Sequence, residues 1–258
     1  MSSTTKKSAS SARKPSSLVS HDTRLPQPCK LCGQARELRD SHIIPEFCYA
    51  AMYPPQPALH RFHYMHNVDA GKVKWEQQGF KEYLLCEQCE QKLGVWENYA
   101  TRLFKTELPQ PASGQAKPIL FYGLDYAHLK LFFLSVLWRA SVSTLPFFEH
   151  VRLGPHEDKI RDMLFRGIPG DPTDYGCIVS LLLLGEQPLR VCVEPIPLQI
   201  RDQDCYRFVF GGFMLDYFLS AGNLPPAFRE RMLKSDGTLT IEQIGTSGSR
   251  VGEFCLEQ

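Results

Sequence analysis

The alternation of hydrophobic and polar positions begins only after about residue 25. Residues 1–25 are rich in Ser, Thr, Ala and Lys and contain almost no large hydrophobic side chain. Such a segment has too little apolar surface to offset the entropy that is lost on ordering. We therefore expect residues 1–25 to form a disordered tail. The tail is basic, because five Lys and Arg side chains stand against one Asp.

The next segment, residues 26–106, combines short apolar runs with one helical pattern. Leu38 to Pro45 predicts a strand, and Glu46 to Met52 predicts one or two helical turns. Two runs within residues 60–75 predict a pair of strands about a turn. From Cys86 onward, apolar side chains recur at helical spacing, which predicts a helix with one buried face. The recurring residues are Leu93, Trp96, Tyr99, Ala100, Leu103 and Phe104.

A segment rich in Pro, at residues 107–117, is the best candidate for a linker. Residues 118–258 follow it and begin with two helical patterns. Asp125 to Ser143 is apolar nearly all round, which is typical of a buried helix. Glu157 to Phe165 has the pattern of an amphipathic helix.

The helical pattern then gives way to β-rich runs. Three of them are expected to be strands, at Cys177–Leu184, Leu189–Ile196 and Tyr206–Phe213. The predicted fold class is therefore α+β, with an N-terminal ββα-type module followed by an α+β domain. In that second domain, whose role is unknown, helices are expected to precede antiparallel strands.

Two Cys-x-x-Cys pairs mark the N-terminal module. Cys29 and Cys32 form the first pair, and Cys86 and Cys89 form the second. One such step presents two thiolates to a tetrahedral Zn²⁺, and two steps complete a structural site that has no open ligand position. We expect residues 26–106 to bind one structural Zn²⁺ through these four cysteines.

Composition excludes several classes of protein. The 258 residues are 43% hydrophobic and 22% charged, as in an ordinary soluble globular protein. The longest apolar stretches fall short of the about 20 residues that span a bilayer, and no secretory signal is evident, so we expect no membrane association. The five cysteines outside the two pairs are scattered singly, which favours a reducing compartment. The cytoplasm is the expected location.

The distribution of charge limits how nucleic acid could bind. The net charge is +1, and the tail alone contributes +4, so the remaining chain is acidic. A protein that holds nucleic acid mainly through phosphates usually has a basic face. A nucleic-acid site here would be a local patch, with or without help from the tail. The alternative is that the tail is a solvated, disordered arm.

One histidine lies between the two cysteine pairs, in the run Asp40-Ser41-His42-Ile43-Ile44-Pro45. A histidine at the end of a short strand can act as a general base, because its ordinary pKa lies close to neutral pH. The alternative is a structural histidine that hydrogen-bonds the backbone of the cysteine knuckle. The residues alone leave both roles open.

The order of these motifs resembles that of the HNH, or His-Me finger, nucleases over about residues 27–105. In that family a Cys-x-x-Cys-Gly knuckle, a strand with a histidine and a second Cys-x-x-Cys at the start of a helix follow one another. The resemblance implies that His42 activates water and that a second ion, Mg²⁺ or Mn²⁺, stabilises the leaving oxygen. The ligands of this ion would be Asp40 or Ser41 together with Glu90. The chain is also similar to uncharacterised bacterial proteins with the Ser-His-Ile-Ile-Pro motif, which implies a bacterial source.

Two functions from different classes follow. The first is an HNH-like metal-dependent endonuclease that cleaves DNA or RNA, with the C-terminal domain selecting the target or a protein partner. The alternative is a non-catalytic zinc module that binds nucleic acid or protein in a larger assembly. Glu97 lies two helical turns from Glu90, too far to share an ion, and is predicted to be structural or a salt-bridge partner. Arg139, in the apolar helix, is either buried and paired or facing a phosphate.

Overall fold

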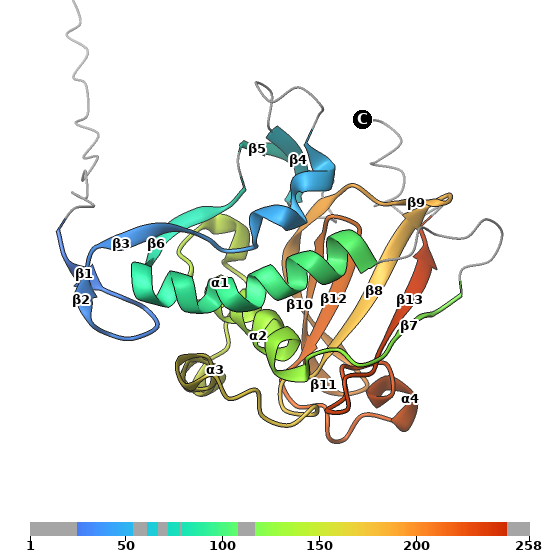
Figure 1. Cartoon of the computed structure of the whole chain (residues 1–258). Helices are drawn as coiled ribbons and strands as arrows, with labels where there is room; N and C mark the ends of the chain where they lie inside the picture. Colours follow the sequence, from blue (N-terminus) through green and yellow to red (C-terminus); the bar gives the residue numbers. More distant parts are fainter. Residues whose placement is uncertain (1–24, 54–60, 67–71, 78, 108–116, 247–258) are drawn as a thin grey trace, which may run out of the picture.

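A computed structural model describes residues 25–53, 61–66, 72–77, 79–107 and 117–246 of the chain. The expected tail up to residue 24 and most of the expected linker lie outside these ranges. Within them, helices pack on a mixed sheet (Figure 1), which confirms the predicted α+β class. No helix in the described part of the chain is long and apolar enough to cross a membrane.

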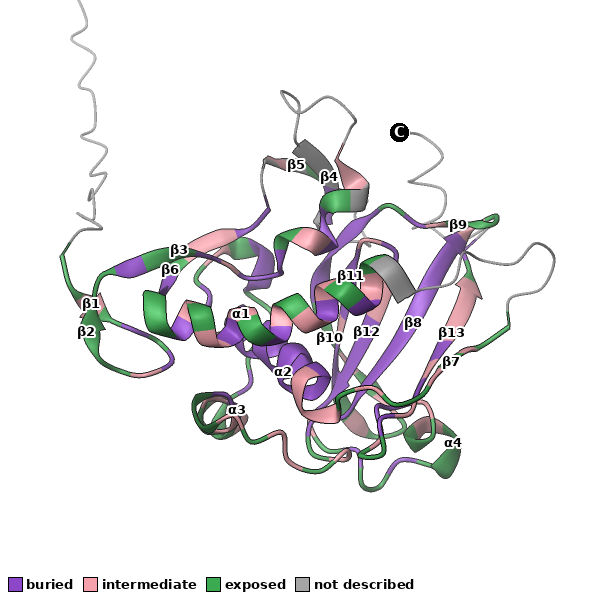
Figure 2. Ribbon diagram, in the orientation of Figure 1, coloured by how far each residue is buried: buried purple, intermediate pink, exposed green. Residues whose placement is uncertain are grey.

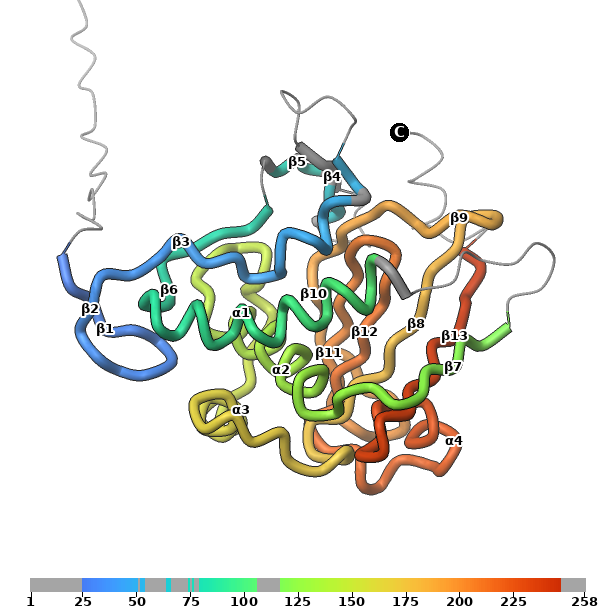
Figure 3. The backbone as a smooth tube through the Cα atoms, viewed as in Figure 1, coloured from blue at the N-terminus to red at the C-terminus, as the bar shows by residue number. Residues whose placement is uncertain are grey.

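The N-terminal segment forms two small antiparallel sheets and a helix. Of these strands, β1 pairs with β2 and β3 pairs with β6, and α1 follows β6 without a loop. Figure 3 shows that these two small sheets extend to one side of the main sheet and that α1 leads back towards it. The elements are β1 (Gln27–Pro28), β2 (Ala35–Arg36), β3 (Leu38–His42), β6 (Lys81–Cys86) and α1 (Glu87–Arg102).

Three short helical segments flank this unit. The 3₁₀ helices η1 (Glu46–Cys48) and η2 (Ala50–Met52) follow β3, as the predicted helical turns. A π-helical turn, η5 (Leu103–Glu107), continues α1. The buried residues of α1 include Leu93, Trp96 and Ala100, so the predicted apolar face of this helix is confirmed.

The main sheet has nine strands among the described residues, in the order β5-β4-β10-β11-β12-β8-β13-β7, with β9 paired to β8. Two of its strands, β4 and β5, come from the N-terminal segment. The strands are β4 (Arg61–His66), β5 (Lys72–Gln77), β7 (Ile119–Phe121), β8 (Cys177–Leu184), β9 (Gln187–Pro188), β10 (Cys192–Ile200), β11 (Gln203–Phe210), β12 (Phe213–Phe218) and β13 (Leu239–Gly245).

The expected order of helices followed by antiparallel strands in residues 118–258 is wrong in two respects: β7 precedes α2, and one pair of strands within these residues is parallel. A further parallel pair joins these residues to the N-terminal segment. β10 runs parallel to β4, with Cys192 opposite Tyr64. β13 runs parallel to β8, with Glu242 opposite Ser180. Parallel neighbours are joined by long connections rather than by tight turns, so these pairings leave no hairpin signal in the sequence. The sheet is therefore mixed.

Two prolines of β10 lie where the sheet tolerates them. The register between β10 and β11 shifts between Val193 and Ile196, so Pro195 lies in the irregular stretch. The ladder with β4 includes Cys192 and Val193, and Pro197 lies beyond it, opposite Tyr206 of β11. Because proline has no N–H, a position outside the second ladder loses no hydrogen bond there.

The central helix, α2 (Tyr126–Val142), confirms the predicted buried helix. Asp125 caps it by accepting a hydrogen bond from the N–H of His128 at 3.0 Å. Every residue from Leu129 to Ser141 is buried, and Figure 2 shows this helix in the colour of buried residues. α1 and α3 (Pro155–Arg166) both pack against α2. Two short helices complete the fold, η6 (Pro146–Phe148) and α4 (Pro226–Arg229).

One hydrophobic core joins the N-terminal segment to the rest of the chain. It includes Leu85 of β6, Trp96 of α1, Trp138 of α2 and Phe208 of β11. The face of α1 that was predicted from helical spacing thus packs into the same core as the main sheet. The position of the N-terminal unit is therefore fixed by apolar burial as well as by its own local contacts.

Lys130 is a charged residue within the buried part of α2 and gives a prediction about pH. It is 2% exposed, and its Nζ donates to the carbonyl oxygens of Asp174 and Tyr175 at 2.6 and 3.0 Å. Burial lowers the pKa of Lys130 to about 8. The unfolded chain therefore keeps this proton to higher pH than the folded chain, so this group contributes stability that grows as pH rises above about 8.

We expect the difference in unfolding free energy, the natural chain minus Lys130→Met, to grow with pH. The expected increase is about 3 kcal/mol between pH 7 and pH 10.5, from a lowering of two to three units at 1.36 kcal/mol each. Urea denaturation of both proteins across this range measures it, and all other groups titrate in both. A difference that stays constant with pH would contradict the buried ammonium.

Candidate metal centre and the His42 strand

The four paired cysteines meet at one point, as their spacing predicts. Their sulfur atoms all lie within 4.8 Å of one another, and those of Cys32 and Cys86 are 3.9 Å apart. Tetrahedral Zn–S bonds of about 2.3 Å place two sulfurs about 3.8 Å apart. The cluster therefore fits a metal ion held by four thiolates. Cys29, Cys86 and Cys89 are buried, whereas Cys32 is half-buried.

Backbone hydrogen bonds shape the first cysteine pair into a tight turn. The N–H of Gly33 donates to the carbonyl of Cys29 at 2.8 Å, and the N–H of Cys29 donates to the carbonyl of Gln34 at 2.9 Å. Gly33 has φ of +75°, a left-handed conformation that glycine adopts without strain. The N–H of Cys86 donates to Sγ of Cys29 at 3.3 Å, which links the two pairs.

The second cysteine pair lies at the junction of β6 and α1. Cys86 ends the strand and is the N-cap of the helix, and Cys89 lies in the first helical turn. The N-terminal end of a helix carries a partial positive charge, which favours a thiolate. Nη2 of Arg39 donates to Glu87 at 2.7 Å and joins β3 to the start of the helix.

The thiols differ in how readily they lose a proton. Burial raises the pKa of Cys89 and also that of Cys32. Burial acts in the same direction on Cys29, but hydrogen bonds from the backbone at Cys32 and Cys86 outweigh it, so the pKa of Cys29 is lowered. Four thiolates at one buried point repel one another, and a bound cation removes this repulsion.

The remaining candidate residues lie on β3 and on α1. Along β3, Asp40 is exposed, Ser41 is 1% exposed and His42 is half-buried. Side chains alternate along a strand, so Asp40 and His42 share one face and Ser41 lies on the other. The Ser41 hydroxyl donates to the carbonyl of Arg39 at 3.2 Å. It also lies close enough to the carboxyl group of Glu90 to lower the pKa of that group. The structure thus brings Ser41 and Glu90 together.

Arg139 of α2 connects this pair to the core. Its side chain is 1% exposed, and Nη1 lies 2.6 Å from Oε1 of Glu97. Nη1 also donates to the carbonyl of His42 at 2.7 Å, and Nε donates to the carbonyl of Ser135 at 3.2 Å. Of the two roles expected for Arg139, buried and paired is confirmed, and Glu97 is confirmed as a salt-bridge partner. The contact with the His42 backbone has no signal in the sequence.

The environment of Glu90 limits what it can bind. Burial raises the pKa of Glu90, while the Ser41 hydroxyl and the charge of Arg139 act in the opposite direction. Mg²⁺ is commonly held by one or two carboxylates, water and substrate phosphates. The described side chains at this point offer one carboxyl group and one hydroxyl, and Arg139 already supplies positive charge. A divalent ion therefore fits here only with Glu90 as its protein ligand and with most of its other coordination positions open to water or substrate.

The ring of His42 faces a glycine. A Cβ atom added to Gly79 would lie 3.4 Å from Cδ2 of His42 and 2.7 Å from the ring of Tyr49. Gly79 also has φ of +79°, so a side chain there would be strained in both respects. The N–H of Ile43 donates to the carbonyl of Phe80 at 2.9 Å, which fixes the chain directly after His42.

Polar contacts attach the cysteine unit to the rest of the molecule. Glu82 of β6 accepts hydrogen bonds from the hydroxyls of Ser143 and Thr144, at 2.7 and 2.6 Å, just past the end of α2. Nη1 of Arg161 in α3 donates to the carbonyl of Leu31 at 3.4 Å. These contacts position the knuckle against α2 and α3.

A second group of ligand-type side chains was missed from the sequence. Nε2 of His150 lies 3.5 Å from Glu194 and 3.7 Å from Glu149. Glu194 belongs to β10, far along the chain from Glu149 and His150, so no spacing motif in the sequence indicates the group. Two of its three members are exposed, whereas Glu194 is buried.

Comparison with known proteins finds no match for this chain. No protein-family model matches the chain, and neither a curated protein nor a solved structure matches it.

Proposed function

We propose that the chain is an HNH-like metal-dependent endonuclease that cleaves DNA or RNA and carries a structural Zn²⁺ on its four paired cysteines. One observation carries the proposal. His42 lies half-buried at the end of β3, which pairs with β6. The cysteine cluster joins the turn between β1 and β2 to the junction of β6 and α1, and α1 places Glu90 near Ser41. The motif order that resembles the HNH nucleases supports the same function.

Each candidate residue has a role in this proposal. His42 accepts the proton of the attacking water. Glu90 binds Mg²⁺ or Mn²⁺, with Ser41 beside it, and the chemistry that the ion supplies is stabilisation of the leaving oxygen. Asp40 lies on the face of His42, so it is placed to orient the ring or the water rather than to share the ion with Glu90. The four thiolates leave the zinc no open position, so its role is structural.

A second function is favoured by the burial of the Ser41–Glu90 pair. Ser41 is almost completely inaccessible, and Arg139 places a guanidinium near Glu90 and Glu97 of α1. These contacts are also those that a non-catalytic zinc module needs to fix α1 against α2. Such a module would bind nucleic acid or a protein partner in a larger assembly, and its zinc would hold the binding surface.

A cleavage assay separates the two functions. We expect the purified protein to cleave single- or double-stranded DNA or RNA only when Mg²⁺ or Mn²⁺ is added. His42→Ala should lower the rate by about 100-fold or more, because it removes the general base. Glu90→Gln should also lower the rate and recover in part at high metal concentration, because a weakened ligand set still binds when the ion is in excess.

The matched control for the cleavage assay is His128→Ala. His128 is a partly exposed histidine paired with Asp125 at 2.7 Å and lies on α2, outside the β3-β6-α1 unit. This variant should cut at the parental rate, and all three variants should keep their zinc. Absence of cleavage that depends on a divalent ion, or a His42→Ala protein that cuts as fast as its parent, would exclude the nuclease and leave the non-catalytic module.

A further inference from the structure

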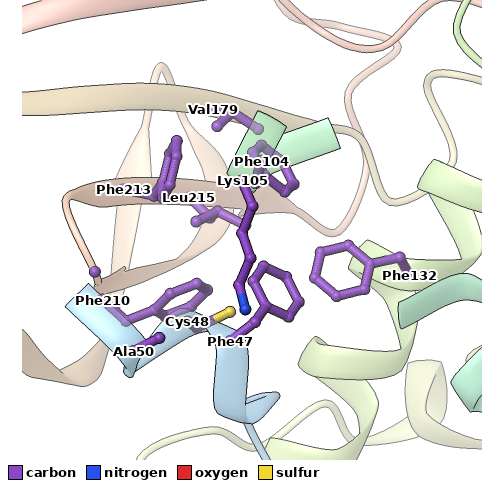
Figure 4. Close-up of a pocket in the computed structure, with 11 residues that line it drawn as sticks. Phe47, Cys48, Ala50, Phe104, Lys105, Phe132, Val179, Phe210, Phe213 and Leu215 are labelled. Carbon is purple, nitrogen blue, oxygen red and sulfur yellow. The ribbon is translucent and has the colours of Figure 1, made fainter. Parts of the chain in front are cut away.

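An apolar hollow lies between the main sheet, α2, the 3₁₀ helices and the end of α1. Its volume is about 160 Å³. Besides Val179 of β8, five phenylalanine rings and one leucine from β12 line it, as Figure 4 shows. These residues are Phe47, Phe104, Phe132, Phe210, Phe213 and Leu215. The hollow shares none of its lining residues with the cysteine cluster or with the Ser41–Glu90 pair.

The rings that line the hollow support one another. Phe47 lies against Phe132 with ring centroids 5.9 Å apart, and Phe104 meets Phe213 edge to face at 5.0 Å. Two backbone segments also pack tightly at one side of the hollow, because a Cβ atom on Gly211 would lie 2.3 Å from the carbonyl oxygen of Cys48. The wall is therefore held in place before any ligand enters, which lowers the entropy lost on binding.

One cation borders this apolar space. Lys105, in the π-helical turn after α1, lines the hollow, and Figure 4 shows its side chain among the aromatic rings. Among the described residues, no carboxylate forms an ion pair with Lys105. Lys105 is exposed at the edge of the hollow. An anion held there has apolar walls on one side, where its attraction to the ammonium is stronger than in open water.

We propose that the hollow binds a small monocarboxylic acid with an aromatic or branched apolar body. A cavity of about 150 Å³ lined by apolar side chains is large enough for benzene, so the body of the ligand is about one ring. The ring gains edge-to-face contacts with the phenylalanines, and the carboxylate pairs with Lys105 at the open side. This binding site goes beyond the proposed nuclease and does not depend on it.

A fluorine-labelled acid tests the proposal. We expect ¹⁹F NMR titration of the full chain with 4-fluorophenylacetate to show saturable binding at least tenfold tighter than that of the neutral 4-fluorophenylacetamide. Lys105→Met should lower the affinity for the acid to that for the amide and leave the affinity for the amide unchanged. Lys105→Arg should keep the preference, because it keeps the charge.

Two further variants test whether the probe binds in the hollow. Ala50 lines the hollow and is exposed, so Ala50→Trp should block entry and weaken both probes at least tenfold while the thermal midpoint stays unchanged. Lys159→Met, on the exposed side of α3, should change neither affinity. Equal affinity for acid and amide, an unaffected Lys105→Met protein, or no saturable binding of the acid up to about 10 mM would overturn the proposal.

Discussion

Cys86→Ser is expected to release the bound zinc and to unfold the β3-β6-α1 unit at neutral pH. Cys86 links the two cysteine pairs through its own sulfur and through the N–H that donates to Cys29. In zinc-finger peptides a structural Zn²⁺ contributes about 10–16 kcal/mol of apparent binding free energy, and that free energy stabilises the fold. Because Leu85 and Trp96 also belong to the main core, the stability of the whole chain should fall by several kcal/mol, on the order of 4 or more.

Metal analysis and thermal unfolding of the same preparation measure both effects. Cys205→Ser is the matched control, because Cys205 is equally buried but lies on β11, away from the cluster. It should keep a full equivalent of zinc and lose only about 1–2 kcal/mol, the effect of burying a hydroxyl. A Cys86→Ser protein with full zinc and an unchanged midpoint would show that the four thiols do not hold the metal.

Arg139→Met is expected to destabilise the chain by about 3–5 kcal/mol. The substitution leaves the carboxylate of Glu97 without its cation at 2.6 Å and leaves the carbonyl of His42 without its donor. Arg139 is buried and Glu97 is 25% exposed, so the charge that remains is only partly solvated, and breaking such a pair from one side is costly. Urea denaturation at pH 7 gives the change in unfolding free energy.

Two comparisons isolate the cause of the Arg139 effect. Arg166→Met removes an exposed pair with Asp162 at 2.9 Å and should change stability by about 1 kcal/mol or less. Adding Glu97→Gln to Arg139→Met should recover part of the loss, because the unpaired charge is then absent. If the two substitutions destabilise additively, the ion pair is not what Arg139 contributes.

The cysteine cluster and the helices could be predicted from the sequence because their signals are local. A Cys-x-x-Cys step is a single turn, so each pair of ligands is visible without knowledge of the fold. The apolar run of α2 and the helical spacing of Leu93 and Trp96 likewise depend on residues three or four apart. For Arg139 the sequence left two roles open, a buried ion pair or a contact with a phosphate. Only the structure shows that Arg139 is buried and paired with Glu97.

Contacts between distant segments could not be predicted in the same way. β4 joins β10 and β13 joins β8 as parallel neighbours, and no property of the individual strands specifies those partners. The pairing of β3 with β6 shifts register between Arg39 and Asp40, where Leu84 of β6 has no partner, and no feature of the sequence marks this irregularity. The apolar hollow is assembled from several elements, so its lining has no sequence motif.

The tetrathiolate zinc centre is tested most directly by X-ray absorption at the zinc edge on protein purified without chelators, with metal analysis of the same sample. We predict about one zinc per chain, with four sulfur neighbours at about 2.3 Å and no nitrogen or oxygen in the first shell. Less than about half an equivalent of zinc, or a first shell that contains nitrogen or oxygen ligands, would contradict the centre on Cys29, Cys32, Cys86 and Cys89.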